Sequence, residues 1–344
     1  MRKITWLLAG AGDIAKNRVA SALTAATDSR LLAICDPVRE KAEALAAAVG
    51  GATVYADYDQ ALRESGAEAV YIATPHHLHV DMCLRALAAN KHFLCEKPLG
   101  INGAECRRLL EATRRSDRIG CCSNYRLFTN QFQTTLRLAR EGTLGDCLGG
   151  WAHDEESDYN PGHTPCLNTL GRSPVLGLGF YPINMVQTLL GTPSSVFASM
   201  TCFNVARQEN YDIADLQNIL LMYPDGRQFS LILNTTVKAS LRHACQFYFS
   251  QGRVYWPECP PHFNSPIVKI TGMRQEVLEE SFSGDRSGQR PNWHLPMVND
   301  FLDAIRQGRQ PLCTIASATQ TACITDALFA SAASGRPEPV AQVS

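Results

Sequence analysis

A glutamate, a lysine and a proline follow directly on a short apolar run. Glu96, Lys97 and Pro98 come after residues 92–95, which read as the end of a buried strand. Charged side chains at such a place are costly unless they face a cavity or a partner. A lysine there can donate to a substrate oxygen, and a glutamate can hold a ribose hydroxyl. The alternative interpretation is a surface ion pair at a strand end.

A histidine-rich stretch, TPHHLH, follows the preceding apolar run, at residues 74–79. In an open α/β sheet, ligands bind outside the carboxyl ends of the strands. The stretch is therefore expected to border a cofactor, although a helix-entry or surface position would also explain each histidine. Its candidate cofactor-binding residues are Thr74, Pro75, His76 and His79.

The sequence GAGDIA at residues 10–15 fits the glycine-rich turn that binds a dinucleotide between a first strand and a first helix. The two glycines allow a tight turn and the close approach of a pyrophosphate to the backbone. Asp36 follows the second apolar run, where a carboxylate accepts hydrogen bonds from a ribose and repels a 2′-phosphate. This favours NAD, while Arg39 keeps NADP open. The candidate cofactor-binding residues here are Gly10, Ala11, Gly12, Asp13, Ile14 and Asp36.

Strand-like and helix-like segments alternate through the first third of the chain. Because the strands are apolar throughout, they predict a parallel, doubly wound sheet covered on both faces, in a dinucleotide-binding domain of residues 1–123. The expected strands lie at 4–8, 31–35, 53–56, 69–73, 92–95 and 119–123.

After residue 123 the pattern changes, which predicts a second, α+β domain over 124–344. Alternating runs indicate a mostly antiparallel sheet with one covered face. These runs lie at 196–203, 216–223, 228–236 and 243–249, and helices are expected near 131–141, 182–190, 296–306 and 316–333.

The composition indicates a globular protein whose partners are small molecules or copies of itself. Lys plus Arg, 32, nearly balances Asp plus Glu, 33, so the charge favours neither nucleic acid nor an anionic membrane. No signal peptide or membrane span is recognised, and the thirteen scattered cysteines show no zinc spacing. We therefore expect a cytoplasmic protein with reduced cysteines and no metal.

The polar stretch 153–165 could suggest a metal site. Because its spacing is irregular, a solvated or substrate-covering loop is the preferred interpretation. The acidic and histidine side chains concerned are His153, Asp154, Glu155, Glu156, Asp158 and His163.

Taken in order, GAGDIA, Asp36, TPHHLH, EKP and the triplet Asn124-Tyr125-Arg126 resemble the Gfo/Idh/MocA family of nicotinamide-dependent oxidoreductases. The resemblance extends to residues 292–311 and covers essentially the whole chain. It implies that Lys97 contacts the reacting oxygen, that Glu96 contacts the nicotinamide ribose and that the Lys97-Pro98 bond is cis. It also implies that Asn124 contacts the cofactor, that Tyr125 and Arg126 contact the substrate, and that an open sheet face mediates a homodimer or homotetramer.

The sequence departs from this resemblance in the second half of the site. Many members carry an aspartate and a histidine where this chain has Gly177 and Tyr181. Tyrosine at that place resembles the glucose-fructose oxidoreductase, dihydrodiol dehydrogenase and sugar-ketoreductase branches. A phenol suits proton transfer to an alkoxide, and Pro182 at the first position of a helix would place Tyr181 at its N-terminus. An interface aromatic is the alternative interpretation.

We therefore expect an NAD(P)-dependent oxidoreductase that moves hydride between the nicotinamide and a secondary alcohol or ketone. The resemblance implies a sugar, a polyol or a related cyclic alcohol as substrate, with Lys97 and Tyr181 as catalytic and substrate-binding residues. Two alternatives stay open: an NAD-dependent glycoside hydrolase with an internal redox cycle, and a non-catalytic dinucleotide sensor.

Overall fold

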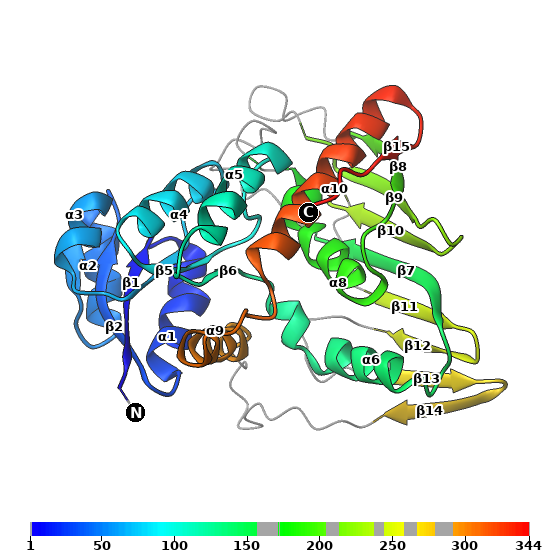
Figure 1. The fold of residues 1–344 in the computed structure, drawn as a ribbon, viewed down its shortest axis with the longest axis horizontal. Helices are drawn as coiled ribbons and strands as arrows, with labels where there is room; N and C mark the ends of the chain where they lie inside the picture. The colour runs from blue at the N-terminus through cyan, green and yellow to red at the C-terminus, as the bar shows by residue number, and fades with distance from the viewer. Residues whose placement is uncertain are drawn as a thin grey trace. The chain divides into compact units, whose positions relative to one another are not determined.

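The computed structural model describes residues 2–156, 171, 173–203, 213–236, 244–257, 267–278 and 292–343. The chain forms two compact units (Figure 1). The first comprises Met1–Tyr125 and Asp285–Thr319, and the second comprises Arg126–Gly284 and Gln320–Ser344. This grouping differs from the expected division after residue 123, because a late segment returns to the first unit.

The first unit is built on a six-stranded sheet in which every pair of neighbours is parallel. The order β3-β2-β1-β4-β5-β6 reverses direction between β1 and β4, which is the doubly wound arrangement expected from the sequence. The strands are β1 (Ile4–Ala9), β2 (Ser29–Cys35), β3 (Thr53–Tyr55), β4 (Ala69–Ile72), β5 (His92–Cys95) and β6 (Gly120–Cys122).

Helices connect these strands, as the alternation of strand-like and helix-like segments predicts. The first begins with a short π-helical turn, η1 (Ala15–Val19), before α1 (Ala20–Ala25). Asn102 caps the helix α5 (Gly103–Arg114) by accepting a 2.9 Å hydrogen bond from the Glu105 N–H. The other connections are α2 (Arg39–Ala48), α3 (Tyr58–Glu64), η2 (His76–Leu78) and α4 (His79–Ala88).

A helix from late in the sequence, α9 (Leu295–Gln307), completes the first unit and lies beside α1 (Figure 1). Phe301 of α9 is fully buried, and its ring centroid lies 5.5 Å from that of Trp6 in β1. Just before α9, the Asn292 amide donates to the Arg18 carbonyl at 3.0 Å and to the Ser21 hydroxyl at 2.8 Å. These contacts tie the late segment to η1 and α1.

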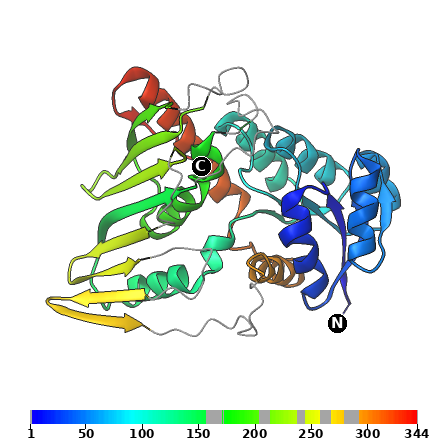
Figure 2. The ribbon, with the colours of Figure 1, turned by 180° about the vertical axis from the view of Figure 1, so that it is seen from behind.

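The second unit holds a nine-stranded sheet of order β14-β13-β12-β11-β7-β10-β9-β8-β15. All neighbours are antiparallel except β7 and β10, so the mostly antiparallel sheet expected from the sequence is confirmed. Figure 2 shows it from behind, with β13 and β14 at one edge. Its strands are β7 (Cys147–Glu155), β8 (Ser195–Thr201), β9 (Leu216–Met222), β10 (Gln228–Asn234), β11 (Ala244–Phe249), β12 (Gly252–Trp256), β13 (Ile267–Thr271), β14 (Arg274–Leu278) and β15 (Glu338–Pro339).

The polar stretch that begins at residue 153 was expected to form a loop, but its first three residues belong to a strand. Residues 153–155 form the end of β7, which pairs with β10 on one side and with β11 on the other. Asp154 and Glu155 are buried, so the polar sequence conceals a central strand. Asp158 and His163 lie outside the described residues.

The helices of the second unit include α6 (Asn130–Glu141), α7 (Pro174–Gly177), α8 (Phe180–Leu190) and α10 (Ile315–Ser334), which starts in the first unit. The Trp256 indole of β12 donates to the Thr135 hydroxyl of α6 at 3.1 Å, which anchors that helix on the sheet. The helix α8 begins at Phe180, so Pro182 occupies its third position rather than the expected first. Tyr181 still lies in the first turn.

No helix in the described part of the chain has the length and apolar character needed to cross a bilayer.

Candidate functional site

The glycine-rich turn between β1 and η1 leaves room beside its backbone at one glycine and none at the other. Gly10 has φ +98°, and a Cβ there would lie 2.3 Å from the Ala73 carbonyl oxygen. A Cβ at Gly12 would meet nothing within 4 Å. The turn thus requires Gly10 for its conformation, while Gly12 leaves open space that a phosphate group can approach. A surface hollow beside it is lined by Asp13, Ile14, Asn17 and Arg18.

Asp36 follows β2 and lies against this turn. One carboxylate oxygen accepts a 2.8 Å hydrogen bond from the Ala11 N–H, and the other accepts a 2.9 Å bond from the Val38 N–H. Each carboxylate oxygen has a second lone pair, so Asp36 can still accept from a ribose hydroxyl. Arg39 forms a 2.7 Å ion pair with Glu43, which offsets its charge locally. The residues present therefore fit NAD.

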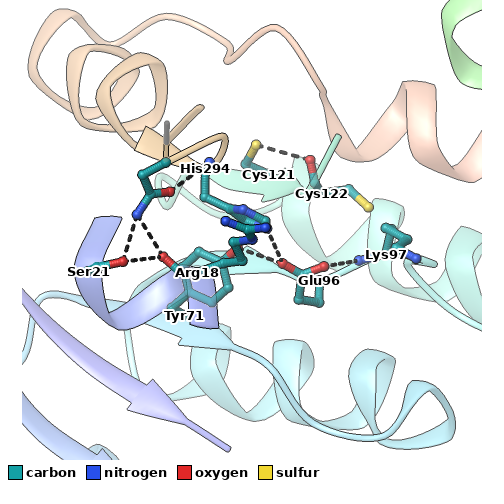
Figure 3. A network of polar contacts seen from close by, with 9 residues as sticks. Arg18, Ser21, Tyr71, Glu96, Lys97, Cys121, Cys122 and His294 are labelled. Carbon is teal, nitrogen blue, oxygen red and sulfur yellow. Dashed lines mark hydrogen bonds and ion pairs between the residues drawn. The ribbon is translucent and has the colours of Figure 1, made fainter. Parts of the chain in front are cut away.

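Glu96 lies at the centre of a buried polar cluster at the carboxyl end of β5 (Figure 3). The Tyr71 hydroxyl donates to Glu96 Oε1 at 2.8 Å, and His294 Nε2 lies 3.2 Å from the same oxygen. The Lys97 backbone N–H donates to the other oxygen at 3.2 Å. Burial, and then the adjacent carboxylate, hold the pKa of Tyr71 well above its ordinary value, so its hydroxyl stays protonated.

Burial alone would raise the pKa of Glu96, because a carboxylate is costly away from water. The hydrogen bond and charge of His294, followed by the Tyr71 hydroxyl and the Lys97 charge, outweigh burial and lower the pKa to about 2. Glu96 is therefore ionised at neutral pH. An ionised carboxylate only accepts hydrogen bonds, which suits a ribose hydroxyl as its partner.

His79 joins the loop after β4 to the turn after β5. Its Nδ1 lies 2.7 Å from the Pro98 carbonyl oxygen and its Nε2 lies 2.9 Å from that of Thr74. Burial lowers the pKa of His79, but Cys95 and the two carbonyls outweigh it and raise the pKa to about 9. Because the ring is fully buried and both nitrogens are engaged, it has no atom left for the predicted cofactor contact. Its observed role is to hold the two turns together.

The other residues predicted from TPHHLH lie at the same end of β4. Pro75 is exposed, while Thr74 and His76 are partly exposed. Asn124 is fully buried after β6, and the Lys97-Pro98 peptide bond is cis, as the resemblance implied. The candidate cofactor residues from 10 to 124 therefore belong to one unit, around the carboxyl ends of its strands.

Two residues of this cluster, Tyr71 and His294, were missed by sequence reasoning. The stretch 292–294 also stacks aromatic side chains: the Tyr125 ring lies 5.5 Å from Trp293 and 5.5 Å from His294. The Arg18 guanidinium lies 4.4 Å from the Trp293 ring centroid on the side of η1. The triplet Asn-Trp-His before a helix was the available signal, but nothing local showed what it contacts.

A second cluster belongs to the other unit and centres on Arg126. Its Nη1 lies 2.7 Å from Asp154 Oδ2, and both side chains are 3% exposed. The guanidinium carbon lies 4.5 Å from the centre of the Tyr181 ring, within the range of a cation–π contact. The ion pair offsets the charge of Arg126, and the predicted contact of Arg126 with the substrate stays a prediction.

The expected absence of a metal site can be examined at residues 153–155. His153 Nε2 contacts Glu155 Oε1 at 2.8 Å, while the intervening Asp154 turns to the opposite face of the sheet. Within the described ranges, no three His, Cys, Asp or Glu side chains gather as metal ligands would.

Comparison with protein families gives two matches along the chain. Residues 4–125 match the model described as "Oxidoreductase family, NAD-binding Rossmann fold", and residues 132–255 match the "GFO/IDH/MocA C-terminal domain". Together the two stretches make up more than two thirds of the chain.

Individual relatives are more distant. A dTDP-3,4-didehydro-2,6-dideoxy-alpha-D-glucose 3-reductase of Streptomyces violaceoruber is 28% identical over 79% of each chain. A trans-1,2-dihydrobenzene-1,2-diol dehydrogenase of mouse (Mus musculus) is 27% identical over 65% of this chain and 66% of its own. A solved structure of levoglucosan dehydrogenase with NADH and L-sorbose shares the fold over 100% of both chains, with a TM-score of 0.88 and 20% identity. The matched models and the geometry agree that this chain belongs to the Gfo/Idh/MocA family of oxidoreductases with an NAD-binding Rossmann fold.

Proposed function

We propose that the protein transfers hydride between NAD and a secondary alcohol or ketone of a sugar, polyol or related cyclic alcohol. The observation that carries this proposal is the ionised, buried Glu96 beside Lys97 at the carboxyl end of β5. Two relatives support the substrate class, because their names specify a nucleotide sugar and a cyclic diol.

The residues of this chain divide the work as follows. Glu96 would accept a hydrogen bond from the nicotinamide ribose. The nucleotide would be held by Gly10, Ala11, Gly12, Asp13, Ile14, Asp36, Thr74, Pro75, His76 and Asn124. When bound, the nicotinamide takes or returns the hydride at its C4 atom. Lys97 donates an N–H to the substrate oxygen, and Tyr181 exchanges the proton of that oxygen. Tyr125 would line the substrate site. Oxidation of the alcohol thus breaks one C–H and one O–H bond and forms the C=O bond.

NAD is proposed over NADP. The Asp36 carboxylate would repel a 2′-phosphate, and Arg39, the cation that could attract one, is paired with Glu43. A lower Michaelis constant for NAD⁺ than for NADP⁺ is the expected result, and a preference for NADP⁺ would contradict this assignment.

The catalytic assignment is tested with Lys97→Ala and Tyr181→Phe. The purified variants are compared for turnover on a panel of methyl glucosides, myo-inositol and L-sorbose, and for NADH affinity by fluorescence titration. Each variant is expected to lose about 100-fold or more of kcat, the usual worth of a proton-transfer group. NADH affinity is expected to stay within about threefold. Unchanged turnover in both variants would overturn the assignment.

The open face of the nine-stranded sheet supports a homodimer or homotetramer. One row of cross-strand partners runs over eight strands on this face, and six of its members are apolar or aromatic residues whose side chains are partly or largely exposed. Trp151 and Tyr255 lie within it with ring centroids 6.1 Å apart. The row is Phe197, Leu220, Ser230, Trp151, Gln246, Tyr255, Val268 and Val277.

A reducing compartment such as the cytoplasm is proposed from the cysteines. No disulfide joins the eleven described cysteines, and nine of them are buried. Protein purified without reductant and then unfolded is expected to titrate as thirteen thiols, the number in the sequence. A substoichiometric result would point to disulfides and an oxidising compartment.

A further inference from the structure

The helix preceding Tyr181 has no carboxylate at the position where the resemblance expects one. Gly177 ends α7, is buried, and donates its N–H to the Ser173 carbonyl at 3.0 Å. Tyr181 follows in the first turn of α8. If this tyrosine transfers a proton, its ring must be held in place by groups other than a side chain at residue 177.

A carboxylate approaches the same region from the sheet. Asp154 belongs to β7, and its strand partner Leu233 in β10 is buried, so Asp154 faces the interior of the unit. Its Oδ2 is 2.7 Å from Arg126 Nη1. The Arg126 guanidinium in turn lies 4.5 Å from the centre of the Tyr181 ring. Strand, arginine and tyrosine therefore form a continuous chain of contacts.

The burial of this pair makes each member depend on the other. Arg126 and Asp154 are each 3% exposed, so removing one would take a short, buried ion-pair contact from the other. The carboxylate fixes where the guanidinium can lie, because an arginine forms short, directional hydrogen bonds to a carboxylate. A cation held over an aromatic ring then restricts the position of that ring. Asp154 touches Arg126 in this chain, and Arg126 touches Tyr181.

We propose that Asp154 is a positioning residue for proton transfer by Tyr181, acting through Arg126 and taking the place of the carboxylate missing at residue 177. The inference rests on the proposed function of Tyr181. It assigns a role in the reaction to a strand residue and changes Arg126 from a substrate ligand into a support for the catalytic ring.

A double-mutant cycle of Asp154→Asn with Tyr181→Phe tests this inference, on the panel substrate that gives turnover. In the parent protein, Asp154→Asn is expected to lower kcat about tenfold or more, with KM and NADH affinity within about twofold. In the Tyr181→Phe background the same substitution is expected to change kcat by less than about twofold, because the group it positions is gone. Glu155→Gln is the matched control, because it removes a charge from the next residue of β7, which lies on the opposite face of the sheet. It should leave kcat within about twofold of the parent value.

The outcomes separate this inference from the proposed function. An equal loss of kcat from Asp154→Asn in both backgrounds would show that Asp154 acts independently of Tyr181 and overturn the inference alone. Full turnover in Tyr181→Phe would overturn the role of the tyrosine and the inference with it. If Asp154→Asn does not fold, the double variant Arg126→Met with Asp154→Leu removes both charges of the ion pair together. That variant is expected to fold and to lose turnover, and parent-level kcat in it would contradict the inference.

Discussion

The two glycines of the GAGDIA turn serve different purposes, so their alanine variants can be compared as a matched pair. Gly10→Ala should lower the free energy of unfolding by more than about 2 kcal/mol, because its φ is +98° and its Cβ would collide with the Ala73 carbonyl. Gly12→Ala should change stability by less than about 0.5 kcal/mol but weaken NADH binding about tenfold or more, because its Cβ occupies only open space. Urea unfolding and NADH titration measure both effects. Equal behaviour of the two variants would contradict the assignment of this turn to the phosphates.

The buried Glu96 gives the fold a defined acid dependence. Its pKa in the folded protein, about 2, lies below the ordinary 4.5, so its contribution to stability is present above about pH 4.5 and is lost as the pH falls toward 2. The difference corresponds to on the order of 3 kcal/mol. The stability gap between the parent and Glu96→Gln should therefore narrow on acidification. Glu43→Gln, at an exposed ion pair, should differ from the parent by less than about 0.5 kcal/mol throughout. If the stability difference between the parent and Glu96→Gln does not change with pH, the contacts of Glu96 with His294 and Tyr71 are contradicted.

At the scale of elements, α9 belongs physically to a unit that begins almost 300 residues earlier. Phe301→Ala should cost about 3–5 kcal/mol, because the ring is fully buried against Trp6. Met273→Ala, at a fully exposed side chain, should change stability by less than about 0.5 kcal/mol. Chemical denaturation of the two variants makes the comparison. A small effect at Phe301 would mean that the first unit does not need α9.

Elements that follow a simple local pattern were predictable, and those defined by distant partners were not. The strands β1 to β6 are apolar runs between helices, and their order follows from the parallel, doubly wound arrangement. By contrast, β7 was missed because it ends in His-Asp-Glu, and two of those side chains are buried through contacts with Arg126 and Asn234. The strands β12 to β14 also went unassigned. A local pattern cannot reveal a buried carboxylate whose partner lies 28 residues away.

The same limit applies to the candidate site. Glu96 was identified from its place after β5, but the reason it is ionised comes from His294, 198 residues later in the chain. Likewise, Arg126 was identified from its motif, but its ion pair with Asp154 was not foreseen, because that partner lies in the strand that was read as a loop. Residue types and spacing located the motifs, whereas charge and orientation depended on tertiary contacts.

At the scale of the whole molecule, the apolar row over the open sheet predicts self-association. Phe197→Asp with Ile232→Asp introduces charges at side chains that are 37% and 38% exposed on that face. This pair of changes should reduce the mass in solution to that of the 37.7 kDa monomer, because an unpaired charge opposes burial of the face. Met273→Asp, outside the row, should keep the parent mass. Light scattering reads the result, and a monomeric parent protein would contradict the proposed interface.

Hydride transfer between NAD and an alcohol or ketone can be followed directly by the near-ultraviolet absorbance of reduced nicotinamide. Purified protein is mixed with NAD⁺ or NADH and then with each panel alcohol or keto sugar. Net formation or loss of NADH is expected with at least one of these compounds, at a rate that Lys97→Ala abolishes. Tight cofactor binding without net turnover on any of them would contradict this expectation and favour a hydrolase with an internal redox cycle or a dinucleotide sensor.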